Sequence, residues 1–157
     1  MSGWKFVLMV ACLWCVGGEA YGASATTGLC AKLHEIRSVP LREGWPETDP
    51  VYLAISVNRQ AARTCLLERI GDATLMPDPR SEPTKVDGFV VGDLAFFLLV
   101  GFEMLPFEDL LPPEVRQQFP ERGVFAYFEW VGKPGNRRRL QRAAEDWTRG
   151  HVRGWGE

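Results

Sequence analysis

The sequence predicts an all-α fold, a compact orthogonal bundle of about five to seven short helices around one central apolar helix. Three observations lead to this fold class. Residues 94–100 are all apolar, so this segment must be covered on every side. Apolar residues recur at helical spacing in the segments before and after it. Proline, glycine and capping residues divide the rest of the chain into short helices.

Length and composition fit a single domain. The chain has 157 residues, of which 46% are apolar and 24% charged, as in ordinary globular proteins. The formal net charge of −2 argues against a dedicated nucleic-acid binder, which would be basic. We therefore expect one helical domain over residues 26–150, a flexible tail over 151–157, and no nucleic-acid partner.

The first 25 residues have the layout of a secretory signal peptide. Lys5 is the only charged side chain before Glu19, and the apolar run 6–16 is followed by small residues. This pattern predicts export, with the mature protein in the periplasm or secreted. Two alternatives stay open: an N-terminal anchor that is never cut, and a lipid anchor at Cys12, because residues 8–12 resemble a bacterial lipobox.

Cysteine usage agrees with export. Cys12 and Cys15 lie inside the apolar leader, where they are more simply small apolar residues than a redox or metal pair. Cys30 and Cys65 remain after cleavage. In an oxidising compartment this isolated pair predicts one disulfide, which closes a loop of ~35 residues and stabilises the fold by about 3–4 kcal/mol. Two buried free thiols are the alternative.

The first helix of the mature chain is expected near residue 27. Leu29, Leu33 and Ile36 keep helical spacing, and Thr27 is suited to cap the helix. Pro40 ends it, because the residue before a proline disfavours helical backbone.

A second helical pattern covers residues 50–70. Thr48 or Asp49 can cap it, and Pro50 fits the first turn. Asn58 interrupts the pattern, so the segment is either one long helix or two helices hinged there. Two short amphipathic helices, the second containing A-x-x-x-C-L-x-x-x-I-G-D, resemble a single HEAT-type helical repeat unit over residues 50–71. No second copy follows at a ~40-residue period.

A proline-rich segment, 72–88, is expected to be a long loop. Loops of this length are uncommon in compact domains and often functional. We favour a crossover that takes the chain to the far side of the core. The alternative is a partner-binding loop that uses Asp78, Arg80 and Glu82, since loops carry many binding sites.

The central helix is expected over residues 94–104. Asp93 can cap it and stabilise its first amides. Gly101 marks its end or a close packing site. The apolar run is too short to cross a bilayer, which needs ~20 apolar residues.

The C-terminal third is expected to form short helices and one long surface helix. Prolines divide residues 106–122, with one or two helical turns at 106–111 and another at 113–119. Residues 123–131 favour a helix over a strand. Asn136 is expected to cap a helix whose narrow apolar stripe lies on the core and which ends at Gly150.

Candidate chemistry is sparse. We identify no catalytic residues, metal ligands or cofactor site, because no nucleophile, base and orienter occur in a recognised pattern. The basic run Arg137, Arg138 and Arg139 is interpreted as a solvated helix face, with an acidic protein partner as the sharper alternative. Glu103 and Glu108 could serve a glycan-acting enzyme.

The sequence therefore favours an exported, non-enzymatic protein-binding module that binds another protein of the cell envelope. An immunity-type inhibitor or an envelope accessory factor is the specific hypothesis within this class, by fold-level analogy. The glycan-acting enzyme and a purely structural envelope protein are the alternatives.

Overall fold

The regular structure of the protein is helical, as the sequence predicts. A computed structural model describes residues 28–36, 49–76 and 88–153, and in these ranges helices pack into an all-α bundle. The named elements, in chain order, are the 3-10 helix η1 (Leu33–Glu35), α2 (Pro50–Val57), α3 (Arg59–Arg69), α4 (Val91–Gly101), the 3-10 helix η3 (Glu108–Leu110), α5 (Pro113–Arg116), α6 (Phe119–Arg122), α7 (Phe125–Val131) and α8 (Asn136–Arg153).

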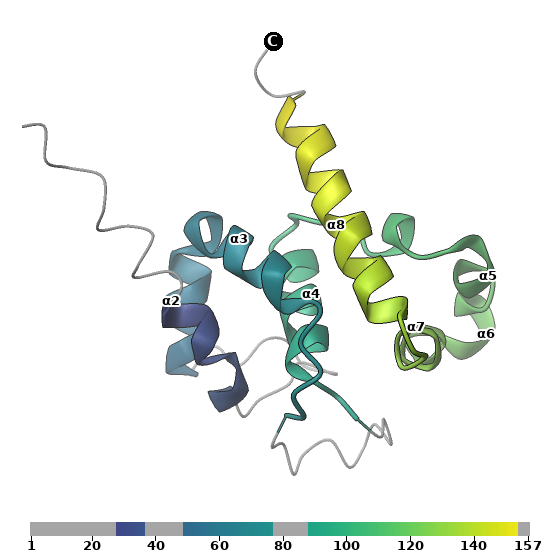
Figure 1. The fold of residues 1–157 in the computed structure, drawn as a ribbon, viewed down its shortest axis with the longest axis horizontal. Helices are drawn as coiled ribbons and strands as arrows, with labels where there is room; N and C mark the ends of the chain where they lie inside the picture. The colour runs from purple at the N-terminus through teal and green to yellow at the C-terminus, as the bar shows by residue number, and fades with distance from the viewer. Residues whose placement is uncertain (1–27, 37–48, 77–87, 154–157) are drawn as a thin grey trace, which may run out of the picture.

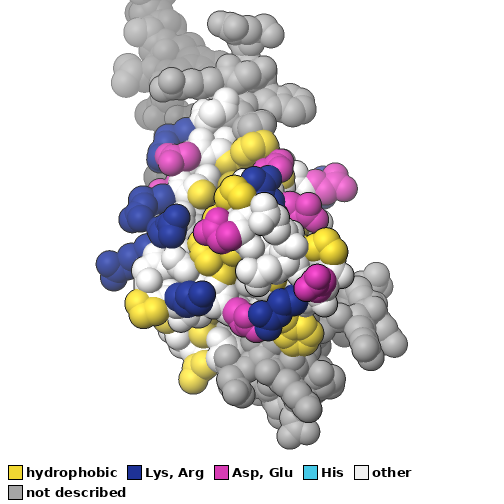
Figure 2. Space-filling view, turned by 90° about the vertical axis from the view of Figure 1, so that its right-hand side faces the viewer, with side chains coloured by type: hydrophobic (Ala, Val, Ile, Leu, Met, Phe, Trp, Pro, Cys, Tyr) yellow, Lys and Arg dark blue, Asp and Glu magenta, His cyan; other side chains and the backbone are white. Residues whose placement is uncertain are grey.

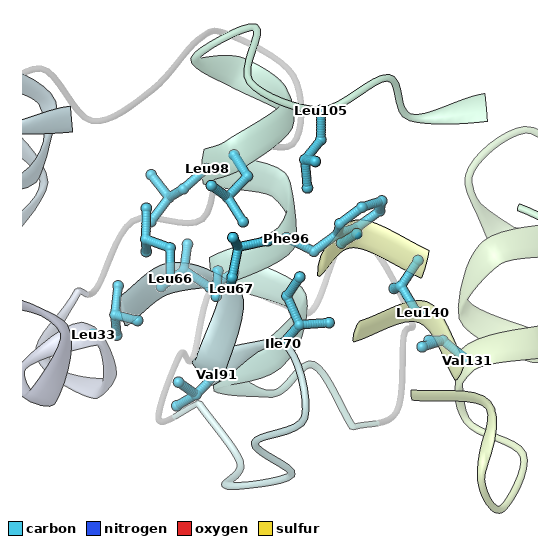
Figure 3. Close-up of a cluster of buried hydrophobic side chains, with 14 of the residues drawn as sticks. Leu33, Leu66, Leu67, Ile70, Val91, Phe96, Leu98, Leu105, Val131 and Leu140 are labelled. Atoms are coloured by element: carbon cyan, nitrogen blue, oxygen red, sulfur yellow. The ribbon is translucent and has the colours of Figure 1, made fainter. Parts of the chain in front are cut away.

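Helix α4 lies in the middle of the bundle. In Figure 1, α3 lies on one side of it with α2 beyond, and α8 lies on the other side with α5 to α7 beyond. Figure 3 shows Leu66 of α3, Ile70 directly after it and Leu140 of α8 directed toward the side chains of α4. These three side chains are fully buried, so α4 is covered by helices that come from both halves of the chain.

The central helix begins earlier than the sequence suggested. It spans Val91–Gly101, not residues 94–104, so Asp93 lies in its first turn instead of capping it. The Asp93 carboxylate accepts a hydrogen bond from the Val90 backbone N–H at 3.1 Å, as the acidic residue of a capping box does. The helix also ends earlier than expected, at Gly101, which has the first of the two roles that the sequence suggested for it.

Tertiary contacts explain the earlier start of α4. The backbone N–H of Gly92 donates to the Asp72 carbonyl at 2.9 Å, and that of Val91 donates to Thr74. A Cβ atom added to Gly92 would lie 2.3 Å from the carbonyl oxygen of Ile70. Glycine is therefore required here, because the end of α3 approaches the first turn of α4 too closely for a side chain.

The two ends of the predicted loop 72–88 lie side by side. Leu75 and Val90 form an isolated antiparallel β-bridge, and the Met76 N–H donates to the Phe89 carbonyl at 3.0 Å. The chain therefore leaves and returns at one place. The crossover interpretation is wrong, because a crossover to the far side of the core would separate these ends. Pairing of two short extended segments, which hydrophobic periodicity does not reveal, joins them instead.

Residues 50–70 form two helices, which settles the alternative that the sequence left open. The break is at Asn58, whose side-chain amide donates to the Ala54 carbonyl at the end of α2 at 2.8 Å. Asp49 is the cap of α2, since its carboxylate accepts hydrogen bonds from two backbone amides of the first turn. Thr48 lies outside the described residues.

A disulfide joins the first described segment to α3. Cys30 and Cys65 are bonded, with their Cα atoms 6.0 Å apart, as the cysteine count predicts. The helix expected to reach Pro40 is shorter, because the chain tightens into η1 and is extended at Ile36. Leu33 and Ile36 are nevertheless fully buried, so the segment packs on the core through the apolar positions that suggested the helix.

The C-terminal half follows the expected sequence of short helices. Residues 125–131 are helical, and their aromatic side chains pack against α4, with the Tyr127 and Phe96 rings 5.6 Å apart. Helix α8 begins at Asn136 and continues past Gly150 to Arg153; residues 154–157 of the expected tail lie outside the described residues. Asn136 is not a preceding cap, and its side chain donates to the Trp130 carbonyl at 2.8 Å.

Candidate functional site

Two surface cavities are lined by described residues of α3 and α8. The first, which we call the charged cavity, has a volume of about 650 Å³. The second, which we call the Arg63 groove, has a volume of about 770 Å³. The charged cavity is lined by Glu68, Arg69, Gly71, Asp72, Arg138, Gln141, Arg142 and Glu145, and the Arg63 groove by Arg59, Gln60, Arg63, Val100, Phe102, Glu103, Met104, Leu105, Pro106 and Trp147.

The charged cavity is electrostatically balanced. Its lining holds three arginines and three carboxylates, and part of this charge is already paired. Arg69 donates to Asp72 at 2.9 Å, and Gln141 donates to Glu145 at 3.0 Å. Opposite charges in equal number leave the lining without a net charge to attract a ligand of one sign.

Asp72 has a local structural role in this cavity. Burial opposes its ionisation, but hydrogen bonds from Thr74 and the nearby Arg69 guanidinium outweigh that effect and lower the pKa of Asp72. The Thr74 backbone N–H donates to this carboxylate at 2.9 Å. Asp72 therefore orders the turn after α3.

The Arg63 groove combines an apolar floor with a polar rim. The floor denotes its buried and half-buried apolar side chains, from the end of α4, the residues after it and Trp147 of α8. The rim denotes its polar side chains, which include two arginines of α3. Phe102 is also stacked on Tyr52 of α2, with ring centroids 6.2 Å apart. An apolar centre with polar groups at its edge is the arrangement of protein-binding surfaces.

The two arginines of the rim lie on the same side of α3. Arg59 and Arg63 are four residues apart, which brings them onto one face of a helix. The Nε atom of Arg63 is buried and has no hydrogen-bond partner among the described residues. An N–H group that has lost water without gaining a partner carries a free-energy cost, while the rest of the half-buried Arg63 side chain lines the cavity and can pair with a carboxylate.

Glu103 occupies an unfavourable backbone conformation beside these arginines. Its φ of 58° makes it the only residue other than glycine with a positive φ in the described part of the chain. The Glu103 N–H donates to the Val100 carbonyl and the Met104 N–H to the Leu99 carbonyl, both at 2.9 Å. This pair of bonds is the Schellman motif, in which glycine normally occupies the position of Glu103.

Glutamate at this position costs about 1–2 kcal/mol relative to a residue that favours left-handed backbone. Glu103 is exposed and lines the Arg63 groove. The fold therefore accepts a local penalty to place a carboxylate at the edge of the groove. Strained backbone of this kind is typical of ligand-binding positions.

A separate polar network lies inside the bundle. Asp93 is completely buried. Its carboxylate accepts hydrogen bonds from the Tyr127 hydroxyl at 2.8 Å and from the Arg137 guanidinium at 2.6 and 3.3 Å. Burial, followed by the negative charge of Asp93, raises the pKa of Tyr127 well above its usual value. The network lines neither cavity, so its role is to connect α4, α7 and α8.

The three arginines of the basic run at the start of α8 have different environments, because one of them belongs to this network. Successive residues of a helix point about 100° apart, so Arg137 is turned inward while Arg138 and Arg139 are exposed. The Arg137 side chain is only 14% exposed. For Arg137 the interpretation as a solvated helix face is wrong, because the buried Asp93 carboxylate pairs with it. Arg138 lines the charged cavity.

The remaining predicted site residues are dispersed. Asp78, Arg80 and Glu82 lie outside the described residues, so their proposed role in partner binding stays a prediction. Glu108 is the first residue of η3 and does not line the Arg63 groove, whereas Glu103 does. The structure therefore does not bring these two glutamates into one of the cavities described here.

Sequence reasoning missed the Arg63 groove as a site. Arg59 and Arg63 are ordinary surface residues of an amphipathic helix, and Trp147 is more than 80 positions away along the chain. Glu103 offered one signal, because it stands where the residue after a helix end would most often be glycine. That signal becomes readable only when the end of α4 is known.

Figure 2 shows the face that lies on the right in Figure 1. Positive and negative side chains are interspersed on it, and apolar side chains occur in separate patches. Helices α5 to α7 lie on this side, where Arg116 of α5 pairs with Asp109 of η3, and Arg122 of α6 pairs with Glu129 of α7. Mixed charge of this kind is typical of a solvated surface, so this side offers control positions for tests of the groove.

Comparisons with known proteins give no assignment. No protein-family model matches the sequence, and no curated protein or solved structure is significantly similar to it. The HEAT-type resemblance of residues 50–71 therefore stays a prediction. Within the described ranges, no helix combines the length and the apolar character needed to cross a bilayer.

Proposed function

We propose that this protein is an exported module that binds another protein of the cell envelope through the Arg63 groove. The observation that carries the proposal is Glu103, a carboxylate held in left-handed backbone at the rim of an apolar cavity. Glycine would relieve this strain, so the glutamate side chain is retained at a cost in stability. A binding role for that side chain explains the cost.

The composition of the groove supports a protein partner. Arginine, tryptophan, phenylalanine and methionine, all present in the lining, are enriched at protein interfaces. Tryptophan and arginine are also frequent among the residues that contribute most to binding energy. The cavity is open at the surface and rimmed by charge, which suits a projecting side chain of a partner.

The proposed compartment follows from the leader and the disulfide. The first 25 residues have signal-peptide layout, and the Cys30–Cys65 disulfide suits an oxidising compartment. Within the binding class, an immunity-type inhibitor or an envelope accessory factor remains the specific hypothesis. Identification of the partner distinguishes the two, because an inhibitor would bind a toxin and an accessory factor a resident envelope protein.

Site-specific photocrosslinking tests the proposal. The photoreactive residue p-benzoylphenylalanine is placed at Gln60, on the rim of the groove, or at Gln117, an exposed glutamine that follows α5. In the native cells we expect a discrete protein adduct from position 60 that is absent from position 117. The additional substitution Arg63→Glu should remove the adduct, whereas Arg116→Glu should not. The same adducts from both positions, or an adduct insensitive to Arg63→Glu, would refute the groove as the binding site.

A further inference from the structure

The Arg63 groove presents opposite charges at two parts of its rim. Arg59 and Arg63 come from α3, while Glu103 follows α4. Within the described residues, neither arginine forms an ion pair with Glu103 or with another carboxylate. These charges are therefore available to a ligand, and the apolar floor lies in the same cavity.

We infer that the groove binds a segment of another protein in which one large apolar side chain is flanked by a carboxylate and by a cationic side chain. This inference rests on the proposed function and specifies the chemistry of the partner. The apolar side chain contacts Phe102, Met104 and Trp147 of the lining. The carboxylate pairs with Arg63, assisted by Arg59, and the cation pairs with Glu103.

The state of Arg63 explains why a carboxylate is preferred over a neutral polar group. The side chain is half-buried and its Nε–H is already removed from water, so part of the desolvation cost of pairing this guanidinium is already present in the free protein. Carboxylates also bind guanidinium groups through two parallel hydrogen bonds, which adds geometric specificity. Arg59, one helical turn away, increases the positive potential at the same edge.

Glu103 adds a requirement for a positive charge in the bound segment. A carboxylate at the rim repels a uniformly acidic segment and favours one that carries a positive charge on that side. Without Glu103, the groove would accept any acidic and apolar segment. Its backbone position after the end of α4 is set by the Schellman motif, which holds the carboxylate at a defined place.

A set of short peptides tests the inference on the complete exported protein. Each peptide carries fluorescein and a central Phe, separated by glycine from one flanking residue on each side. The flanks are Asp and Lys in either order, Asp and Gln, Asn and Lys, or Asn and Gln. Fluorescence anisotropy gives the affinity of each peptide for the unmodified protein and for the variants Arg63→Gln, Glu103→Gln, Glu103→Gly and Arg116→Gln.

We expect a peptide with both charges to bind about 10-fold or more tightly than the neutral peptide, because hydrogen bonds to charged groups are stronger than those between neutral groups. Arg63→Gln should remove only the benefit of Asp. Glu103→Gln should remove only the benefit of Lys. Arg116→Gln, on the other side of the bundle, should change neither.

Glu103→Gly separates recognition from structure. The change should raise the thermal midpoint, because glycine relieves the backbone strain, and it should also remove the benefit of Lys. A residue with a purely structural role would alter stability alone.

Several outcomes would overturn the inference. These are equal binding of all the peptides, absence of binding, or a charge preference that survives the glutamine variants. A dimer in light scattering that Arg63→Gln disrupts would identify a second copy as the occupant and would also overturn it. If a crosslinked partner still depends on Arg63 while the peptide preference fails, the proposed function stands and only the partner chemistry is wrong.

Discussion

Replacing Arg137 with methionine should destabilise the protein by about 3–5 kcal/mol, the range measured when one partner of a buried ion pair is removed. This range applies because the Arg137–Asp93 ion pair is buried. The Asp93 side chain is 1% exposed and the Arg137 side chain 14% exposed, so water has little access to the carboxylate that loses its guanidinium partner. Methionine keeps an apolar stem of similar length and limits the change to charge and hydrogen bonding.

A second substitution, at Asp93, should partly reverse the loss of stability caused by the first. Asp93→Asn removes the charge that Arg137→Met leaves unpaired, and its amide can still bond with Val90 and Tyr127. The double variant should therefore be more stable than Arg137→Met alone, although each single substitution destabilises. Urea unfolding followed by circular dichroism measures all three variants, with unchanged m-values as the requirement for comparison.

The reasoning would be refuted by a loss of less than about 1 kcal/mol in Arg137→Met, which is the typical value for an exposed ion pair. Additive effects of the two substitutions would also refute it, because they would show that the two side chains do not interact in the folded protein.

Four further predictions concern other parts of the fold. Gly92→Ala should destabilise by about 3 kcal/mol, at the upper end for overpacking, because its Cβ would meet backbone carbonyls of the segment after α3; an unchanged urea midpoint would contradict this close approach. Stability should fall above pH 10 by about 1.4 kcal/mol per pH unit, because the unfolded state can release the Tyr127 proton while the buried phenol retains it; Tyr127→Phe should remove this component, and an alkaline limb identical in both proteins would exclude its source. Reduction of Cys30–Cys65 should cost about 3–4 kcal/mol, measured by urea unfolding with and without dithiothreitol, with no effect of reductant on a Cys30→Ser/Cys65→Ser control. Glu103→Gly should stabilise by about 1 kcal/mol, and a loss of stability would show that the glutamate side chain contributes to the fold itself.

Local features of the sequence predicted much of the fold. Residues 94–100 contain no polar side chain, so burial was the only arrangement in water, and α4 is the central helix. Two capping candidates before Pro50, Thr48 and Asp49, marked the start of α2 because capping depends on adjacent residues. Cys30 and Cys65 were the only cysteines beyond the leader, so their pairing followed from counting.

Contacts between distant residues were not predictable in the same way. Asp93 resembled an ordinary helix cap, yet its partners Tyr127 and Arg137 lie 34 and 44 positions away. The bridge between Leu75 and Val90 likewise leaves no periodic pattern in so short a segment. The errors about the Asp93 cap and the crossover arose where a tertiary contact replaced the local rule.

The candidate site shows the same division between local and distant information. Glu103 and the arginines Arg137–Arg139 were noticed as charges in the sequence. Only the packed bundle turns Arg137 inward and brings Glu103 into the same cavity as Arg63 and Trp147. The sequence by itself determined the helical class, the central helix and the disulfide, because hydrophobic burial, capping and cysteine count act locally or by composition. The tertiary structure alone decided which charged side chains are buried in ion pairs and which remain at the surface. This depends on how helices far apart in the chain pack together.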